Sequence, residues 1–403
     1  MIKLNRHIQI ALGYFFLAAS LGVLLRSFYA IKIPLNYDYI VHTHSHIALL
    51  GWVYLVLTTL IFKIYARKID KYKEYRAIFW FTQLTLVGML LTFPFQGYAV
   101  FSIIFSTLFL FASYWFTWFI MKNVPRELRT TNYYKCINAA LWYMVFSSIG
   151  PWMLGAIMVS LGQESIWYRM SIYFYLHFQY NGWMIMALLG LFFYVLEQHR
   201  IIISNVQFKR FFWSINLGIL LTFFLSTLWT KPNIIFNVLG GVGDVFQILS
   251  FAILLEIVVK SRIKLTDIFS RFQYQLLKTV ALMLGIKMML QLLTSLPYYA
   301  NLAATYLDFT VGYLHWTFLG VMSIGLFLLL DFFKLIYLSK ISYMLYLIGF
   351  AITEVLIFYK GIAAWQGFSM FDGYFETLAI GSFFIPLALI LMLLFNMKSK
   401  TKD

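Results

Sequence analysis

The sequence predicts an all-α membrane protein that crosses the bilayer about twelve times. Hydrophobic residues make up 62% of the 403 residues, whereas charged residues make up only 11%. A soluble globular protein carries about 25% charged residues, so this chain has too few charges to cover a surface exposed to water. We therefore expect lipid or protein to surround most of its side chains.

A helix needs about 20 apolar residues to cross the hydrocarbon core of a bilayer. The charged start of the chain resembles a signal peptide, but the first apolar stretch is too long for a cleaved one and shows no small-residue cleavage site. A short turn with Pro94 and Gly97 separates the third stretch from the fourth. The twelve stretches are residues 8–30, 40–65, 77–96, 98–121, 138–161, 170–196, 211–230, 234–259, 276–296, 308–333, 341–359 and 374–397.

The positive charges predict that both ends of the chain face the cytoplasm. With twelve spans and this orientation, 25 of the 31 Lys and Arg residues lie on the cytoplasmic side, five lie outside and Lys287 lies within a span. Such a bias is typical of multi-pass proteins, and a bacterial inner membrane is the expected location. The net charge of +16 is therefore typical of loops beside a lipid bilayer, and we expect no nucleic-acid partner.

Three histidines share one local pattern. His46, His177 and His315 are each followed by four residues and then by a glycine. They lie in the second, sixth and tenth spans, all of which enter from the outer side, at similar depths. This spacing predicts one transmembrane domain, residues 1–403, built from three four-helix pseudo-repeats with pseudo-threefold symmetry, roughly residues 1–121, 138–260 and 276–397.

Imidazole inside a membrane helix is costly unless it is paired or ligates a metal. Neutral imidazole is a common ligand of haem iron and copper, and a glycine on the same face would let a flat macrocycle approach. Alternatively, each glycine permits close helix packing and each histidine bonds to a neighbouring helix. Three matched motifs favour a haem or metal site.

The second span carries three histidines on two faces. His42 and His46 are one turn apart, while His44 points roughly the other way, so one helix could address two cofactors. Arg26, near the outer end of the first span, could bind a haem propionate through a charge-assisted pair, or it could anchor the helix end.

The topology and these motifs resemble subunit I of the haem–copper oxidase superfamily, which includes nitric-oxide reductases. His44 and His46, followed by Gly51 and Trp52, are similar to the family's two-histidine run, which in the family belongs to helix 10. A further similarity is to NnrS-like haem–copper membrane proteins linked to nitric-oxide tolerance. The resemblance implies an oxidoreductase that handles oxygen or nitric oxide or transfers electrons, with a redox partner or second subunit.

The resemblance also implies a set of ligands. His46 and His315 would be axial ligands of a b-type haem, with His44 as an alternative, near Gly51, Gly320 and Arg26. His177, with His42 or His44, would hold copper or a second haem.

The sequence departs from the family at the copper site. The seventh span has no histidine pair, the tenth has one histidine instead of two, and Asn181 stands where the family has a cross-linking tyrosine, with Tyr180 one position earlier. These departures predict an incomplete copper site.

Two other functions stay open, a twelve-helix transporter and a cofactor-free assembly subunit. The loop at residues 64–70 lacks the Gly-rich Asp-Arg signature of major-facilitator transporters. Four charged residues fall in or near spans, namely Asp244, Glu256, Lys287 and Glu354. Such charges mark proton or ion routes or pair with each other, and for Glu256 and Lys287 an ion pair is favoured over a proton path. The single cysteine, Cys136, excludes an intrachain disulfide.

Overall fold

The computed structural model describes residues 3–398, apart from the side chains of residues 66–68 and 398. The protein is 86% helical, and no strand occurs among the described residues. Within this part of the chain, twelve helices are long and apolar enough to cross a membrane. The all-α class and the number of spans are therefore confirmed.

The chain divides into two compact units. One consists of Met1–Pro125 and Leu326–Asp403, and the other of Arg126–Gly325. The first expected pseudo-repeat lies in the first unit and the second lies in the second unit. The third, residues 276–397, contributes to both, because the division falls within its second spanning helix.

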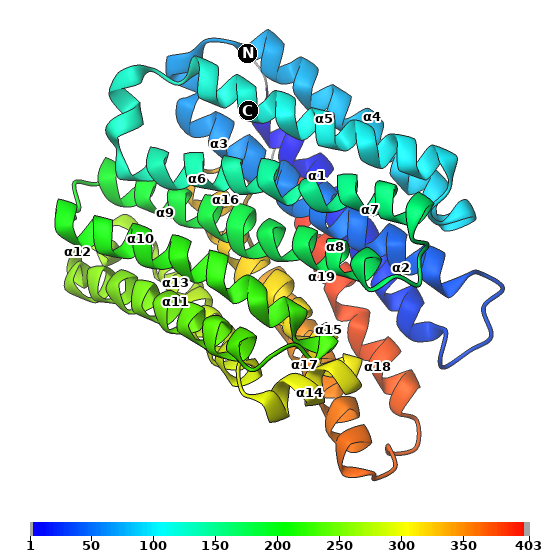
Figure 1. Ribbon diagram of the computed structural model, residues 1–403. Coiled ribbons are helices and arrows are strands. Elements are labelled where there is room, and N and C mark those ends of the chain that lie inside the picture. The colour runs from blue at the N-terminus through cyan, green and yellow to red at the C-terminus, as the bar shows by residue number, and fades with distance from the viewer. Residues whose placement is uncertain (1–2, 399–403) are drawn as a thin grey trace. The chain divides into compact units, whose positions relative to one another are not determined.

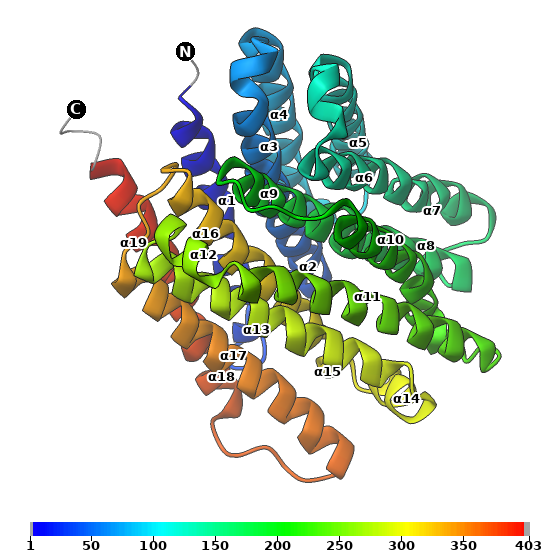
Figure 2. The same cartoon turned by 90° about the vertical axis from the view of Figure 1, so that its left-hand side faces the viewer.

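Among the described residues, the first unit contains six candidate spans, whose helices can be followed in Figures 1 and 2. Its second span is built from three consecutive helical segments, and its last from two. The elements are α1 (Leu4–Ser27), α2 (Tyr37–His46), η1 (Ile47–Tyr54), α3 (Leu55–Ile69), α4 (Tyr72–Gln96), α5 (Val100–Asn123), α17 (Lys340–Gln366), α18 (Tyr374–Ser382) and α19 (Phe384–Lys398). Helix α16 (Ile324–Phe332) begins at the end of the second unit and continues into the first.

The second unit contains the remaining spans and three short helices. The elements are η2 (Arg126–Thr130), α6 (Asn132–Ser147), α7 (Ile149–Ser160), α8 (Ile166–His177), η3 (Phe178–Met184), α9 (Ile185–Gln198), α10 (Asn205–Thr222), η4 (Phe223–Thr230), α11 (Ile235–Lys260), α12 (Arg262–Ile268), α13 (Arg271–Thr294), α14 (Pro297–Thr305), α15 (Leu307–His315) and η5 (Trp316–Ser323).

Helices α10 and α11 lie side by side in both views (Figures 1 and 2). Two glycines allow this close approach. A Cβ atom at Gly218 would lie 3.0 Å from the carbonyl oxygen of Gly243, and one at Gly243 would lie 2.7 Å from the backbone nitrogen of Thr222. Small residues at such contacts let backbones approach in membrane proteins, and here they bring the polar residues of α11 next to α10.

The turn between the third and fourth spans is confirmed. Helix α4 ends at Gln96 and α5 begins at Val100. Gly97 has a φ of +58°, and a Cβ atom there would lie 2.5 Å from the ring of Tyr39. The turn therefore depends on glycine for both its backbone conformation and its space.

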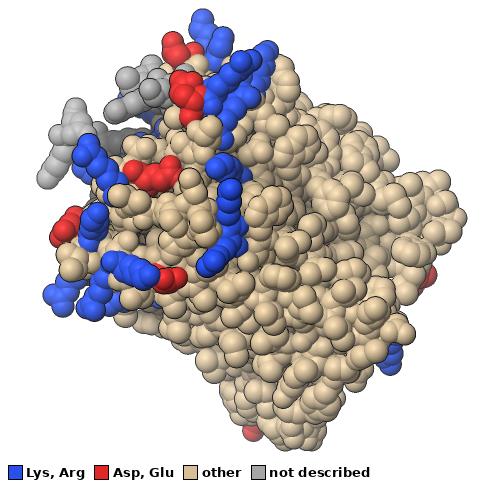
Figure 3. Space-filling model, turned by 60° about the vertical axis from the view of Figure 1, so that its left-hand side comes forward, with Lys and Arg blue, Asp and Glu red and all other residues tan. Residues whose placement is uncertain are grey.

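Large apolar side chains are exposed along the spans. Leu91, Val355 and Ile380 are 63%, 67% and 68% exposed. Figure 3 shows wide stretches of uncharged surface on the visible face. Contiguous apolar surface of this kind is rare on soluble monomers, so a lipid bilayer is the expected surrounding.

Each of the three matched histidines is followed directly by a π-helical segment. Segments η1, η3 and η5 begin one residue after His46, His177 and His315. In η5, the hydroxyl of Ser323 donates 2.8 Å to the carbonyl of Phe318, five residues earlier. π-Helical turns are rare and often occur at functional sites. The sequence motif therefore has a shared local structure in both units.

Candidate functional site

The histidines of the second span use two faces of α2, as the sequence predicts. Helix α2 begins at Tyr37, so His42 lies inside the helix. The rings of His42 and His46 lie 4.6 and 5.9 Å from the ring of Tyr98. His44 instead faces α1, where its Nδ1 lies 2.8 Å from the carbonyl oxygen of Ala18.

Backbone carbonyls fix the tautomers of two of these histidines. The Nδ1 atoms of His44 and His46 each lie 2.8 Å from a carbonyl oxygen, that of Ala18 and that of His42 respectively. A carbonyl oxygen only accepts, so each Nδ1 carries the hydrogen and each neutral imidazole has its lone pair on Nε2. Metal-ligating histidines commonly make such a bond. For His46, the hydroxyl of Tyr98 lies 3.4 Å from Nε2.

Arg26 lies beside His44, and a glycine makes room for both. A Cβ atom at Gly22 would lie 3.2 Å from Cε1 of His44 and 3.4 Å from Nη1 of Arg26. The Arg26 guanidinium donates to the carbonyl of Gly22 at 3.4 Å.

Glu354 on α17 is the buried carboxylate of the same unit. Its side chain is only 3% exposed, and neither of its oxygens has a hydrogen-bond partner among the described residues. Arg26 acts on it electrostatically, but the two groups do not come within ion-pair distance in the described part of the chain. The sequence places Glu354 and Arg26 in separate spans and gives no sign that they interact.

In the first two motifs, a tyrosine side chain packs against the glycine. A Cβ atom at Gly51 would lie 2.8 Å from Cβ of Tyr14, and one at Gly182 would lie 2.7 Å from Cβ of Tyr143. Each tyrosine comes from the preceding spanning helix of its own unit. This contact supports the packing explanation for these two glycines. Gly320, in η5, is also buried.

His177 uses both ring nitrogens within the protein. Its Nε2 donates to the carbonyl of Ile219 at 2.8 Å. Its Nδ1 lies 3.4 Å from the amide nitrogen of Asn181 and 3.3 Å from the hydroxyl of Ser226. A metal would have to displace one of these bonds, so the geometry of His177 fits a structural role better than ligation. No group of three or more His, Cys, Asp or Glu suited to a metal occurs within the described residues.

His315 ends α15 and is half-buried in the second unit. The indole of the next residue, Trp316, donates to the carbonyl of Met283 on α13 at 2.9 Å. This bond ties the start of η5 to α13.

A network of buried polar side chains occupies the second unit. Lys287, which is 0% exposed, donates to the amide oxygens of Asn181 and Gln291 at 2.7 and 2.6 Å. The amide nitrogen of Gln291 donates to Oδ1 of Asp244, and the hydroxyl of Tyr313 donates to Oε1 of Gln291 at 2.8 Å. The Gln291 amide therefore links a buried ammonium to a buried carboxylate.

The network continues in two directions. Asn181 joins it to His177, and Gln247 joins it to Thr222 through a bond of 2.8 Å. Oδ2 of Asp244 is buried and has no hydrogen-bond partner among the described residues. An unsatisfied buried carboxylate oxygen is costly.

The prediction that Glu256 pairs with Lys287 is wrong. Glu256 instead pairs with Lys260 at 2.5 Å, on an exposed part of α11. Glu256 follows Asp244 by twelve residues, which places it about 120° further around the helix at 3.6 residues per turn. Asp244 therefore faces α13, and Glu256 does not.

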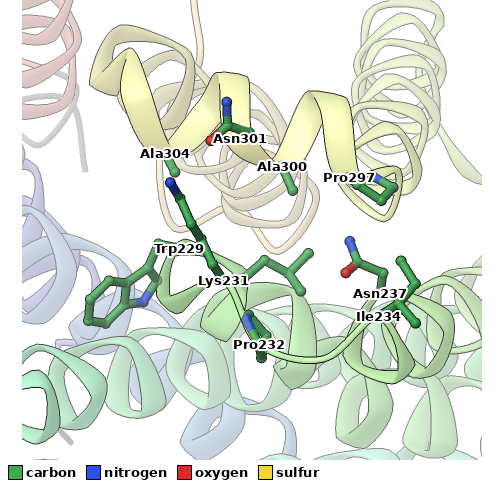
Figure 4. Close-up of a pocket in the computed structure, with 10 residues that line it drawn as sticks. Trp229, Lys231, Pro232, Ile234, Asn237, Pro297, Ala300, Asn301 and Ala304 are labelled. Atoms are coloured by element: carbon green, nitrogen blue, oxygen red, sulfur yellow. The ribbon is translucent and has the colours of Figure 1, made fainter.

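A cavity of about 380 Å³ opens at the end of the second unit where α11 begins. Figure 4 shows Asn301, Ala300 and Ala304 of α14 across from Trp229, Lys231 and Asn237. The indole N–H of Trp229 has no acceptor within the described residues. The positive-inside rule predicts that this end of the unit faces outward.

Sequence reasoning named Asp244 and Lys287 but missed Gln247, Gln291 and Tyr313. A signal was present, because Asp244 with Gln247 and Lys287 with Gln291 have spacings of three and four residues. Such spacings place polar groups on one face of a helix. The spacing does not show which faces of different helices pack against each other.

No protein-family model matches this chain, and a comparison with curated proteins gives no match.

Proposed function

We propose that the chain is a haem-binding integral membrane protein of oxidoreductase type, distantly related to subunit I of the haem–copper oxidases. A b-type haem would be held by His46, with His44 as an alternative, and His315 is the candidate ligand of the second unit. The observation that carries the proposal is the pair of Nδ1–carbonyl bonds of His44 and His46, which place the lone pair of each neutral imidazole on Nε2. At His46, ligation would displace the Tyr98 hydroxyl from Nε2.

Two further features support a haem rather than a copper centre. Arg26 lies beside His44 and would pair with a propionate through charge-assisted hydrogen bonds. His177, the candidate for copper, already uses both nitrogens in hydrogen bonds. The proposal is therefore limited to haem. When bound, a haem supplies one-electron chemistry.

His44 and His46 face opposite sides of α2, so they would not bind the two faces of one haem. Ligation by His46 and ligation by His44 therefore predict different results. If His46 is the ligand, His46→Ala abolishes haem binding and His44→Ala leaves it largely intact; if His44 is the ligand, the reverse holds.

The test is the absorption spectrum and haem content of protein purified from haem-replete cells. We expect a Soret band that is lost in the variant lacking the ligand histidine, which is His46→Ala or His44→Ala for the first unit and His315→Ala for the second. His199→Ala is the matched control, because His199 is exposed at the end of α9. Colourless wild-type protein, or a spectrum unchanged in all three of the His44, His46 and His315 variants, would contradict the proposal.

The twelve-helix transporter remains a second candidate. It is favoured by the buried Asp244–Gln291–Lys287 network, because charged groups inside a membrane bundle commonly mark ion or substrate routes. Uptake of a solute into proteoliposomes that is lost in Lys287→Met would favour it over a haem protein.

A further inference from the structure

The seam between α11 and α13 is polar for about two turns below the cavity. At its outer end, the amide of Asn237 donates to the carbonyl of Ser295 at 3.0 Å. One turn further, a Cβ atom at Gly241 would lie 3.2 Å from the hydroxyl of Ser295. Next comes the bond of Gln291 to Asp244. Residues 237, 241 and 244 are spaced to share one face of α11.

The outer end of this seam meets the cavity. Asn237 lines the cavity together with the exposed polar groups of Lys231 and Asn301 (Figure 4). Seven residues separate Asn237 from Asp244, which is about 10 Å along the helix at 1.5 Å per residue. A polar surface therefore connects the cavity to the buried carboxylate.

The inner end of the seam is closed by apolar side chains. Leu284, Met288 and Val321 form a buried cluster. Ile248, Phe251 and Met283 pack against it. The seam thus changes from polar to apolar directly below Asp244 and Gln247, so the polar surface continues toward one end of the unit only.

Ionisable groups on other elements act on Asp244. Lys287 of α13 acts on it electrostatically, and Tyr313 of α15 and Tyr180 of η3 do so as well. His177 of α8 lies further along the chain of bonds, beyond Asn181. Oδ2 of Asp244 has no protein partner among the described residues, so a water molecule in the seam is the natural donor or acceptor for it.

We propose that this seam is a water-accessible half-channel through which Asp244 exchanges a proton with the outer aqueous phase. On release, the carboxyl O–H bond breaks and the proton passes to a seam water and out through the cavity, leaving a carboxylate balanced by Lys287 through Gln291. On uptake, the same steps reverse. The proposal does not depend on haem, and its tests are made on the protein as purified.

The first test measures water access with cysteine variants and a membrane-impermeant, positively charged thiol reagent. We expect Ser295→Cys and Asp244→Cys to react when the reagent is added from the outer side. Ile248→Cys, in the apolar closure, should not react. The native Cys136 is buried and serves as an internal control. Reaction of Ser295→Cys without Asp244→Cys would overturn the half-channel, and so would reaction of Asp244→Cys only from the cytoplasmic side.

The second test follows the proton itself by infrared difference spectroscopy in liposomes after a change of external pH. We expect a carboxylic C=O band that responds to external pH and disappears in Asp244→Asn. Glu354→Gln is the matched control, because Glu354 is a buried carboxyl of the other unit, and it should leave the band unchanged.

The variant Lys287→Gln distinguishes proton exchange at Asp244 from a purely structural pairing of Asp244 with Lys287. Loss of the nearby positive charge disfavours the carboxylate, so the midpoint of the Asp244 band should move to higher pH. A carboxylic band that does not respond to external pH, or that persists in Asp244→Asn, would overturn the half-channel proposal. The haem proposal would be unaffected.

Discussion

At the scale of single residues, Lys287 places an ammonium group in the interior of the second unit. It is fully buried, and its bonds go to two neutral amides rather than to a carboxylate. The Gln291 side chain links it to Asp244. Removing one partner of a buried pair leaves the other charge uncompensated, which costs more than the pair contributes.

We therefore expect Lys287→Met to lower the free energy of unfolding by about 3–5 kcal/mol, because Asp244 remains as an unbalanced buried carboxylate. The measurement is thermal unfolding of the purified protein in detergent. Asp244→Asn combined with Lys287→Met should recover much of the loss, since both charges are then absent.

Lys260→Met is the matched control for this variant. Lys260 forms the exposed ion pair with Glu256, and exposed pairs contribute little to stability. If Lys287→Met is as stable as Lys260→Met, the buried pair is not a stabilising feature.

At the scale of elements, the π-helical segments and their glycines form a repeated packing unit. In the first unit, Tyr14 of α1 fills the space beside Gly51 in η1; in the second unit, Tyr143 of α6 fills the space beside Gly182 in η3. The hydroxyl of Tyr143 also donates to Oδ1 of Asn216 at 3.0 Å. Each glycine thus sets the distance between a histidine-bearing helix and the preceding spanning helix.

Gly51→Ala and Gly182→Ala should each destabilise the protein by about 1–3 kcal/mol, the usual cost of overpacking a tight contact. The added Cβ atom would lie within 3 Å of a tyrosine side chain. Unfolding temperatures of the single variants test this expectation.

The control for the glycine variants is Gly13→Ala, because a Cβ atom at Gly13 meets nothing within 4 Å. Alanine is a better helix former than glycine, so Gly13→Ala should keep or raise the unfolding temperature. If Gly13→Ala and Gly51→Ala change the unfolding temperature equally, the contact between Gly51 and Tyr14 is not tight in solution.

At the scale of the whole molecule, the orientation in the membrane decides which aqueous phase meets each loop. The positive-inside rule predicts cytoplasmic termini. It places the loop between α12 and α13 inside and the loop between α17 and α18 outside. The cavity of the second unit, at the start of α11, would then face outward.

Topology reporters test this orientation. Alkaline phosphatase fused after Gly367, in the loop that follows α17, should be active because it is exported. The same reporter fused after Ser270, at the start of α13, should be inactive. The opposite pattern would reverse the predicted orientation and with it the side from which the seam opens.

The sequence by itself determined the number of spans, the turn at Gly97 and the two faces of α2. These features depend on local properties, namely the length of apolar runs, the conformational freedom of glycine and the helical period. The same is true of the shared pattern of His46, His177 and His315. Haem binding stays a prediction, because neither the sequence nor the fold alone supplies the cofactor.

Only the tertiary structure decided which polar groups meet. Glu256 and Asp244 both lie on α11, and the sequence favoured Glu256 as the partner of Lys287. The structure turns Asp244 toward α13 and leaves Glu256 with Lys260. The rotation of one helix against another is set by close contacts such as Gly218 with Gly243, and these depend on side-chain shape across the bundle rather than on spacing along the chain.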